Sequence, residues 1–250
     1  DENTRCIYAE TLPNPKLQVF PIGEVAKIGN SHNVPLIVDN TAAPYISKPI
    51  QHGANIVVYS TTKYIGGHGV SIGGLIIDGG NFDWAAAGDR FKMLNTPDAS
   101  YHGAIWTEAA KPLGPIAYIL RARVILLRDL GSAMSPFNAF QIIQGMETLP
   151  LRMRRHMDNT DKMLSFLSES DAVAWVRHPL RDDHPGHAIA KRMMPRGAGS
   201  IIVFGLKGGR EAGRAFIESV ELASQHANVG DLQHANVPMW KGMNVPTFRC

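Results

Sequence analysis

Cysteine and long apolar stretches are both scarce in this sequence. Its two cysteines, Cys6 and Cys250, belong to no C-x-x-C pair and to no other metal-ligand spacing. Two cysteines cannot build a disulfide framework, so a reducing compartment is favoured. No apolar run approaches the roughly 20 residues of a membrane-spanning helix, and the charged opening residues are not those of a signal peptide. We therefore predict a cytoplasmic protein without a membrane partner.

The sequence also lacks a charged arm or stripe. Its 25 basic and 22 acidic residues give a formal net charge of +3 and are spread along the chain. Proteins that bind a phosphate backbone cluster their Lys and Arg residues, so nucleic acid is not an expected partner. The remaining composition is ordinary for a globular protein, with 44% hydrophobic residues among 250. That length suits one large domain or two modest ones.

The first part of the chain contains a segment with helical spacing of its apolar residues, followed by short apolar runs of the length of a β-strand. After Pro21, the apolar positions of 22–29 recur at the spacing of a short helix. The runs 36–38 and 56–59 are continuous and rich in β-branched residues, which is typical of parallel strands buried on both faces. A third run, 74–77, ends in turn residues. An α/β fold with a mostly parallel sheet is expected.

The second half of the chain predicts a smaller α+β unit. We expect helices over 116–130, 139–167 and 211–223, and strands over 173–176 and 201–206. In the first of these helices the apolar side chains step along a single face, and Gly131 follows as a C-terminal stop. The predicted boundary assigns 1–140 to a large domain and 141–250 to a small C-terminal domain.

Two polar clusters of the second half allow a plain and a functional interpretation. Arg152, Arg154 and Arg155 are interpreted as a solvated or interdomain helix face, with an anion site as the alternative. His184 and His187 flank a Pro-Gly turn, and we interpret them as part of a surface loop instead of a metal pair. No metal site is expected.

An identical five-residue segment occurs twice near the C-terminal end. Residues 225–229 read QHANV, and residues 233–237 read the same. Repeat architectures have periods of roughly 20 to 50 residues, so a short duplication or a sequence error explains this better. We assign no site after Asp231.

Polar side chains with complementary chemistry follow the two predicted parallel strands. Asp39 comes after the first strand, and Ser60, Thr62 and Lys63 come after the second. Ligands of an open parallel sheet bind beyond the carboxyl ends of its strands, so these residues are expected to share one crevice. An amine, hydroxyls and a carboxylate suit a phosphate-bearing aldehyde with a protonated pyridine ring. Ser60 and Thr62 are expected to project to the same side of an extended segment and to flank the phosphate.

Each of these residues has a plain interpretation when it is taken alone. A single lysine after a strand is usually a surface residue, and a single aspartate is more often a cap or turn residue. Gly66, Gly67 and Gly69 would let the backbone approach a ligand closely, but their spacing matches neither a dinucleotide fingerprint nor a P-loop. The inference of a site for a phosphate-bearing aldehyde therefore depends on finding these residues together.

That combination resembles a known signature. V-D-N-T at 38–41, followed by S-T-T-K-Y-I-G-G-H-G at 60–69, is similar to the pyridoxal-phosphate (PLP) enzymes of Cys/Met metabolism. The resemblance implies that Lys63 is catalytic and carries PLP as a Schiff base, and that Asp39 bonds the ring nitrogen of the cofactor. E-T-L-P-N-P at 10–15 resembles the E-x-x-x-N-P segment of this family, which implies that Asn14 bonds the ring hydroxyl.

Other segments resemble one subgroup of the family. The stretches 73–84, 101–103 and 111–115 are similar to O-acetylhomoserine sulfhydrylases. This implies a PLP-dependent transferase fold of the aspartate-aminotransferase type. It also implies γ-replacement, in methionine biosynthesis, of the acetyl ester of O-acetyl-L-homoserine by sulfide or a thiol, giving homocysteine or methionine and acetate. Cystathionine γ-synthase and methionine or cystathionine γ-lyase remain alternatives. Dimers or tetramers are expected.

Some parts of the family pattern have no match in this sequence. The N-terminal segment that supplies a phosphate nest, a stacking aromatic and a Tyr/Arg pair is not found, and Arg249 lacks the context of the arginine that binds the substrate carboxylate. A chain incomplete at both ends is therefore expected. The alternative from another class is a catalytically inactive fragment that acts only by association.

Overall fold

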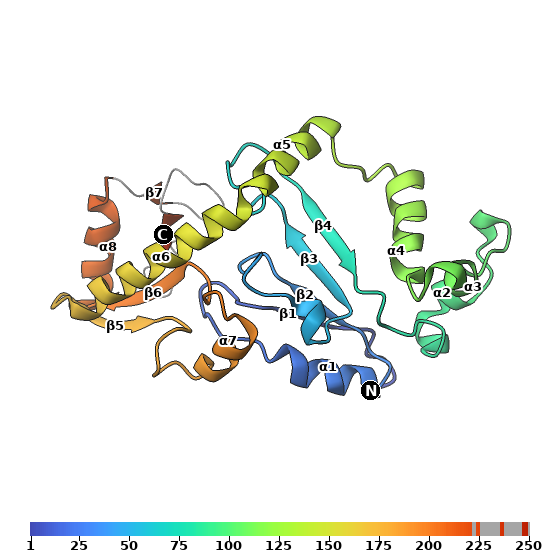
Figure 1. The fold of residues 1–250 in the computed structure, drawn as a ribbon, viewed down its shortest axis with the longest axis horizontal. Helices are drawn as coiled ribbons and strands as arrows, with labels where there is room; N and C mark the ends of the chain where they lie inside the picture. The colour runs from blue at the N-terminus through green and yellow to red at the C-terminus, as the bar shows by residue number, and fades with distance from the viewer. Residues whose placement is uncertain (222–223, 226–235, 238–246, 250) are drawn as a thin grey trace.

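Four strands from the first part of the chain form one sheet. The computed structural model describes residues 1–221, 224–225, 236–237 and 247–249. Its larger sheet contains β1 (Ile7–Glu10), β2 (Leu36–Asp39), β3 (Ile56–Ser60) and β4 (Gly74–Asp78), in that spatial order (Figure 1). β1, β2 and β3 are parallel, and β4 pairs antiparallel with β3. The predicted α/β fold with a mostly parallel sheet is confirmed.

The two faces of this sheet pack against different cores. Leu36 and Val38 point into a core shared with one group of helices, and Ile37 and Ile56 lie on the other face, against the aromatic residues around Trp84. The first group is α1 (Ile22–Ser31), α6 (Leu149–Glu169) and α7 (His187–Met193). The second face is covered by α2 (Lys92–Asn95), α3 (Trp106–Ala110) and α4 (Ala117–Arg121). Burial of β2 and β3 on both faces explains their continuous apolar sequences.

The helix predicted over 116–130 changes its winding partway. It begins as α4 and continues as the π-helix η5 over Ala122–Asp129. Leu127 and Leu130, predicted on the same apolar face, are 41% and 71% exposed. A π-helical turn contains more residues than an α-helical turn, so a face counted at 3.6 residues per turn is lost. The helix is confirmed, and the single apolar face is wrong.

The second predicted helical region consists of two helices that meet at Thr148. α5 (Pro136–Glu147) ends there, and α6 begins with Leu149 and Pro150. Proline is favoured in the first turn of a helix, where its missing N–H is not needed. Together the two helices run from the region beyond β3 and β4 to the smaller sheet (Figure 1).

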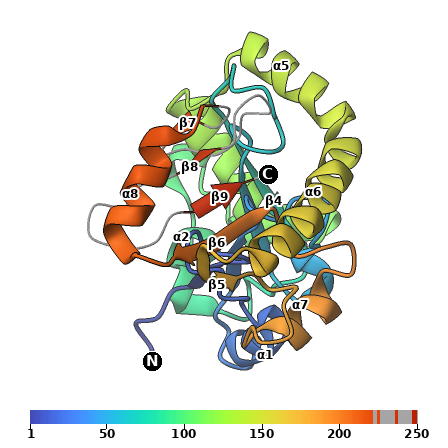
Figure 2. The ribbon, with the colours of Figure 1, turned by 90° about the vertical axis from the view of Figure 1, so that its left-hand side faces the viewer.

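A smaller antiparallel sheet lies at the other end of α6. It contains β5 (Val173–Arg177), β6 (Ile201–Leu206) and β9 (Thr247–Arg249), and α6 and α8 (Gly209–Ser219) pack against it (Figure 2). The predicted strands and the last helix are confirmed. The domain boundary predicted between 140 and 141 falls inside α5 and stays a prediction.

Several short elements complete the described chain. They are the 3₁₀ helices η1 (Pro49–His52), η2 (Gly88–Phe91), η3 (Ala99–Tyr101) and η4 (Lys111–Leu113), and the two-residue strands β7 (Ser224–Gln225) and β8 (Asn236–Val237). The duplicated QHANV segments lie for the most part outside the described residues. In the portion of the chain that the structure describes, no helix combines the length and the apolar character needed to cross a membrane.

Candidate active site

The carboxyl edge of the parallel strands gathers the predicted site residues. β1 leads to Asn14, β2 ends at Asp39, and β3 ends at Ser60 and leads to Lys63. Glu10, the last residue of β1, is in register with Asp39 on β2. Because the three strands are parallel neighbours, their carboxyl ends meet at one edge of the sheet, where ligands of open α/β sheets bind.

The Asp39 carboxylate receives a hydrogen bond on each oxygen. The backbone N–H of Thr41 donates to Oδ1 at 2.8 Å, and the hydroxyl of Tyr8 donates to Oδ2 at 3.3 Å. The Thr41 hydroxyl oxygen in turn accepts the backbone N–H of Ser60 at 2.8 Å. Thr41 therefore fixes the carboxylate and ties the end of β2 to the end of β3.

The negative charge of Asp39 affects its neighbours. Burial raises the pKa of Tyr8 and of Glu10, and the charge of Asp39 raises both pKa values further. Burial also raises the pKa of Tyr59, a hydrogen bond with Asn40 lowers it, and Asp39 raises it. A cationic group is favoured beside Asp39, because it would offset this field.

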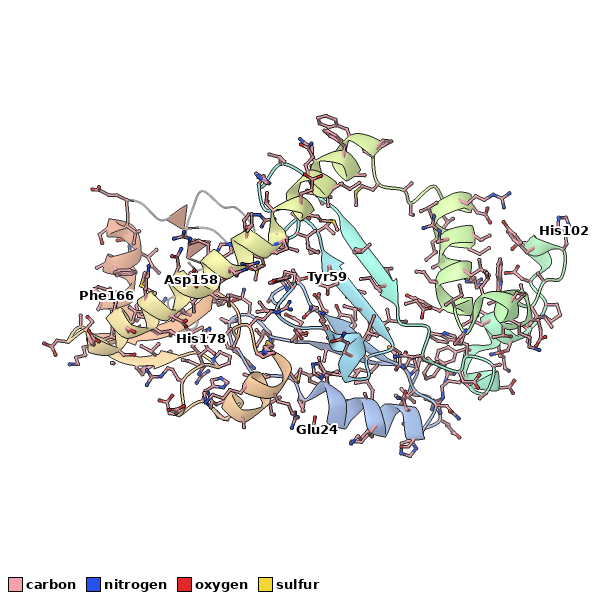
Figure 3. The ribbon with its side chains drawn as sticks, in the orientation of Figure 1. Glu24, Tyr59, His102, Asp158, Phe166 and His178 are labelled. Carbon is pink, nitrogen blue, oxygen red and sulfur yellow. The ribbon has the colours of Figure 1, made fainter. Side chains whose placement is uncertain are left out.

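Asn40 joins the same strand ends from the buried side. Its side chain accepts a hydrogen bond from the Thr11 hydroxyl at 2.8 Å and donates to the Tyr59 hydroxyl at 3.0 Å. It also donates to the carbonyl oxygens of Ala43 and Ser47, both at 3.2 Å. Figure 3 shows Tyr59 on β3, near the middle of the molecule. One side chain thus connects β1, β2 and β3, a role that the sequence analysis did not assign.

The segment that contains Lys63 is folded into turns. The backbone N–H of Lys63 donates to the carbonyl of Ser60 at 3.3 Å, and that of Gly66 donates to the carbonyl of Thr61 at 2.9 Å. Residues 61–66 therefore do not continue the extended backbone of β3. The expectation that side chains alternate along this segment is wrong, because these hydrogen bonds curl the backbone directly after Ser60.

The Thr62 hydroxyl is directed at Gly73. Its oxygen accepts the backbone N–H of Gly73 at 3.0 Å and lies 3.3 Å from the carbonyl oxygen of the same residue. The second contact is a long hydrogen bond in which the hydroxyl donates, as long as the one from Tyr8 to Asp39. The assignments of Ser60 and Thr62 to a phosphate stay predictions.

Asn14 has a buried polar atom without a partner. Its Oδ1 atom is buried and makes no hydrogen bond to any residue that the structure describes. An unpaired buried polar group costs about 1 to 3 kcal/mol, and native proteins contain few of them. A ligand hydroxyl at this position would satisfy the amide. Together with an amine and a carboxylate at the same edge, this residue fits a phosphorylated hydroxypyridine aldehyde.

The arginines of α6 divide between the solvated and the interdomain parts of their plain interpretation. Arg154 and Arg155 are exposed, but Arg152 is half-buried, and its guanidinium donates to the carbonyl oxygens of Tyr64 and Ile65. The solvated face therefore describes Arg154 and Arg155, whereas Arg152 makes a contact across the predicted domain boundary, as the interdomain part of the interpretation expected. Helical spacing gave no signal for this contact, because the partners belong to a segment far away in the sequence.

The two histidines considered for a metal bind backbone groups. His184 Nδ1 accepts the N–H of Gly186 at 3.0 Å, and His187 Nδ1 lies 2.9 Å from the carbonyl oxygen of Pro179. Within the described ranges, no group of three or more His, Cys, Asp or Glu side chains is arranged to hold a metal ion.

Comparisons with known proteins agree on one family. The family model described as Cys/Met metabolism PLP-dependent enzyme matches residues 1–239. An O-acetyl-L-homoserine sulfhydrylase of Leptospira meyeri is 49% identical over 238 residues, which cover 92% of this chain and 53% of the relative. A homocysteine synthase of Schizosaccharomyces pombe is 42% identical over 233 residues, which cover 92% of this chain and 54% of the relative. The chain spans about half the length of these curated relatives.

Solved structures are similar over the whole chain. A structure of O-acetylhomoserine sulfhydrylase from Wolinella succinogenes has a TM-score of 0.83 at 31% identity, and the match covers 67% of that protein. A Campylobacter jejuni structure, provisionally described as an O-acetylhomoserine (thiol)-lyase, has a TM-score of 0.89 at 30% identity and 61% coverage. The latter carries N'-pyridoxyl-lysine-5'-monophosphate. The predicted fold is confirmed by these similarities.

Proposed function

Because this chain belongs to the Cys/Met-metabolism PLP-dependent enzyme family, we propose that it belongs to an O-acetylhomoserine sulfhydrylase. The reaction is replacement of the acetyl ester of O-acetyl-L-homoserine by sulfide or a thiol, giving homocysteine or methionine and acetate. Curated relatives named as O-acetyl-L-homoserine sulfhydrylase and homocysteine synthase support this choice. The observation that carries the proposal is that three parallel strands end at one edge of the sheet, in Asp39 or in the segments that lead to Asn14 and Lys63.

Each site residue is assigned the part that its chemistry allows. The Lys63 amine would bond the aldehyde carbon of PLP, and the Asp39 carboxylate would face the ring nitrogen. The unpaired amide of Asn14 would bind the ring hydroxyl. The hydroxyls of Ser60 and Thr62 would bind the phosphate.

The residues around the cofactor would favour proton removal from the substrate. When bound, PLP supplies an electron sink for the α-carbon of an amino acid. Asp39 strengthens that sink by stabilising the charged form of the ring nitrogen, and Thr41 and Tyr8 keep its carboxylate oriented. The Lys63 amine would act as the base that moves protons at the α- and β-carbons. The acetate leaves from the γ-carbon, where the sulfur nucleophile adds.

We also propose the setting in which the protein works. The scarcity of cysteine supports the cytoplasm. The family resemblance supports a role in methionine biosynthesis and an assembly of two or four copies. The substrates are then an activated amino acid and a small sulfur donor.

Cofactor uptake is the first test. The chain mixed with PLP should develop a visible absorption band, and borohydride should remove that band and leave a pyridoxyl mass on Lys63. Lys63→Ala should abolish the covalent attachment, whereas Lys48→Ala, at an exposed position, should not. A band that survives Lys63→Ala would show that the site assignment is wrong. A chain that never takes up PLP would favour the non-catalytic fragment.

The reaction is the second test. O-acetyl-L-homoserine and sulfide should give homocysteine and acetate. Formation of 2-oxobutyrate and ammonia from the same substrate would instead indicate a γ-lyase. Formation of cystathionine when cysteine replaces sulfide would indicate a cystathionine γ-synthase.

A further inference from the structure

Arg152 lies in the first turn of α6, but its guanidinium binds the segment that follows Lys63. Nη1 donates to the carbonyl oxygen of Tyr64 at 2.6 Å, and Nη2 donates to that of Ile65 at 3.2 Å. Burial lowers the pKa of Arg152 below its ordinary value, but an arginine keeps its charge in proteins. Both hydrogen bonds are therefore charge-assisted and stronger than neutral ones.

The same guanidinium binds the joint between α5 and α6. Nη2 also donates to the carbonyl oxygen of Gly145 at 2.6 Å, and Nε donates to the hydroxyl of Thr148 at 3.0 Å. Gly145 lies near the end of α5, and Thr148 lies between the two helices. Arg152 thus connects the end of α5, the start of α6 and the lysine segment, defined here as residues 63–67.

Two glycines allow these parts to touch. A Cβ atom on Gly145 would lie 2.1 Å from the carbonyl oxygen of Gly66, and a Cβ on Gly67 would lie 2.5 Å from Nη1 of Arg152. Gly67 also has a φ of +71°, which L side chains rarely adopt. The close approach of helix joint and lysine segment therefore depends on the absence of side chains at both positions.

Tyr64 anchors the lysine segment from another direction. Its hydroxyl lies 2.7 Å from the hydroxyl oxygen of Ser200, in a buried hydrogen bond. Ser200 directly precedes β6, so this contact reaches the smaller sheet. The Tyr64 ring also meets the His156 ring of α6 edge to face, with centroids 5.5 Å apart. The side chain of the residue after Lys63 is held by the smaller unit, and its carbonyl is held by Arg152.

From these contacts we propose that Arg152 is a positioning residue for Lys63. It fixes the backbone of the lysine segment against the α5–α6 joint, so that the amine is presented at the edge where β2 ends in Asp39. The guanidinium bonds three carbonyl oxygens and one hydroxyl from three nitrogens fixed in one plane, which the single nitrogen of a lysine does not reproduce. The role given to Lys63 rests on the proposed function, whereas the contacts of Arg152 do not.

Three variants separate the effect of the hydrogen bonds of Arg152 from the effect of its charge. Arg152→Met removes charge and hydrogen bonds, Arg152→Lys keeps the charge but not the fork, and Arg155→Met changes an exposed arginine of the same helix as the control. Titration of the visible band with PLP should show about tenfold weaker binding for Arg152→Met. We expect an intermediate value for Arg152→Lys and no change for Arg155→Met. The pH midpoint of the band should shift in Arg152→Met, shift less in Arg152→Lys and stay unchanged in Arg155→Met.

A second pair of measurements needs no cofactor. Hydrogen exchange should be about tenfold faster in a peptide that covers 61–67 of Arg152→Met, and unchanged in peptides of β6. The pH profile of Lys63 modification by an amine-reactive reagent should also shift, with the exposed Lys48 as the internal reference. A residue that only supports global stability would change neither quantity at temperatures well below melting.

Gly67→Ala provides an independent perturbation. The added methyl group would displace the guanidinium while Arg152 stays in the sequence. We expect the same local increase in exchange at 61–67 as in Arg152→Met. Agreement between the two variants would show that the segment loosens while the Arg152 charge is kept. Because the φ of Gly67 itself disfavours alanine, Arg152→Met carries the assignment to the contact.

The outcomes distinguish this inference from the proposed function. If exchange at 61–67 and the Lys63 pH profile are unchanged in folded Arg152→Met, or if exchange rises equally throughout the chain, Arg152 is not a positioning residue. If the unaltered chain takes up no PLP, the proposed function fails, and the exchange measurements still decide the role of Arg152. If Arg152→Met does not fold, Arg152→Lys supplies the comparison at a matched folded fraction.

Discussion

The carboxyl edge of the larger sheet and the core of the smaller sheet are stabilised in different ways. At the carboxyl edge of β1, β2 and β3, polar side chains such as Asn40 and Thr41 connect one strand to the next by hydrogen bonds. In the smaller sheet, residues 201–205 of β6 are all buried, and the core around Phe204 is apolar. The first arrangement fixes directions, because hydrogen bonds depend on angle, whereas the second contributes stability without direction. The proposed site needs oriented groups, and it is assigned to the hydrogen-bonded edge.

The largest loss of stability is expected when a side chain is truncated in the apolar core of the smaller sheet. Phe204 is 1% exposed and packs edge to face against Phe216, with ring centroids 6.0 Å apart. Phe204→Ala should lower the free energy of unfolding by about 3 to 5 kcal/mol, because it removes contacts and leaves a cavity. Urea unfolding measures this, and Phe166→Ala on the exposed side of α6 is the control. In Phe204→Ala, hydrogen exchange should become faster mainly at β5 and β6. A larger increase at β1–β3 would contradict the separation of the two regions.

A similar loss is expected when the hydrogen-bonded edge loses its central amide. Asn40→Ala would leave the hydroxyls of Thr11 and Tyr59 and two carbonyl oxygens without their present partner. Each unsatisfied buried group is unfavourable, so the free energy of unfolding should fall by about 3 kcal/mol. The exposed Asn30 offers the matched control, Asn30→Ala. A loss below about 1 kcal/mol would mean that water replaces the amide and that the edge does not need it.

A pH-dependent loss is expected where the smaller unit contains a buried histidine. His178 lies beside the smaller sheet (Figure 3), and burial lowers its pKa from 6.5 to about 4. The unfolded chain therefore binds a proton that the folded chain does not, so this contribution is complete above pH 6.5 and is lost as the pH falls toward 4. The loss should approach about 3 kcal/mol. Urea unfolding at several pH values between 7 and 4.5 measures how the free energy of unfolding changes with pH. This change should be smaller in His178→Gln than in the unaltered chain, and an equal change would contradict the assignment.

A smaller loss is expected from the link between the ends of β2 and β3. Thr41→Val removes the oxygen that accepts the Ser60 N–H but keeps the backbone N–H that binds Asp39. The free energy of unfolding should fall by about 1 to 2 kcal/mol, and PLP should bind more weakly because Ser60 is less well fixed. Thr41→Ser keeps the hydroxyl and should restore both properties. Weaker stability with unchanged PLP binding would separate this link from the site.

The smallest effect is expected at the surface between α1 and α7. Glu24 and Arg192 form an ion pair at 2.6 Å, but both side chains are more than half exposed. Solvent and salt screen such pairs, so Glu24→Gln should change the free energy of unfolding by no more than about 0.5 kcal/mol. An effect of several times that size in urea unfolding would show that surface charge, and not only the two sheets, determines stability.

The sequence predicted what depends on nearby residues. Asp39 and Lys63 could be placed near one edge of the sheet because each follows a continuous apolar run, and such runs become parallel strands. The role of Asn40 could not be identified, because its partners Thr11 and Tyr59 are 29 and 19 residues away. The partner of Arg152 could not be identified for the same reason, since Tyr64 is 88 residues away.

Two further differences between the prediction and the structure come from the local path of the backbone. The π-helix after α4 alters the spacing of apolar residues, which periodicity at 3.6 residues per turn cannot reveal. The turns after Ser60 depend on hydrogen bonds between backbone groups, which side-chain alternation does not report. The element types were therefore easier to predict than the directions of the side chains that they carry.

The larger sheet has its strands in the same order in space as along the chain. During synthesis, each strand can therefore be added beside one that has already left the ribosome, and Asn14, Asp39 and Lys63 all emerge long before Arg152. At about 5 to 20 residues per second, several seconds separate Lys63 from Arg152. The nascent chain consequently passes through an interval in which Lys63, the lysine proposed to bind the cofactor, has left the ribosome but its backbone is not yet held by Arg152. On these proposed roles, vitamin B6 would be bound at full strength only after the arrival of α6.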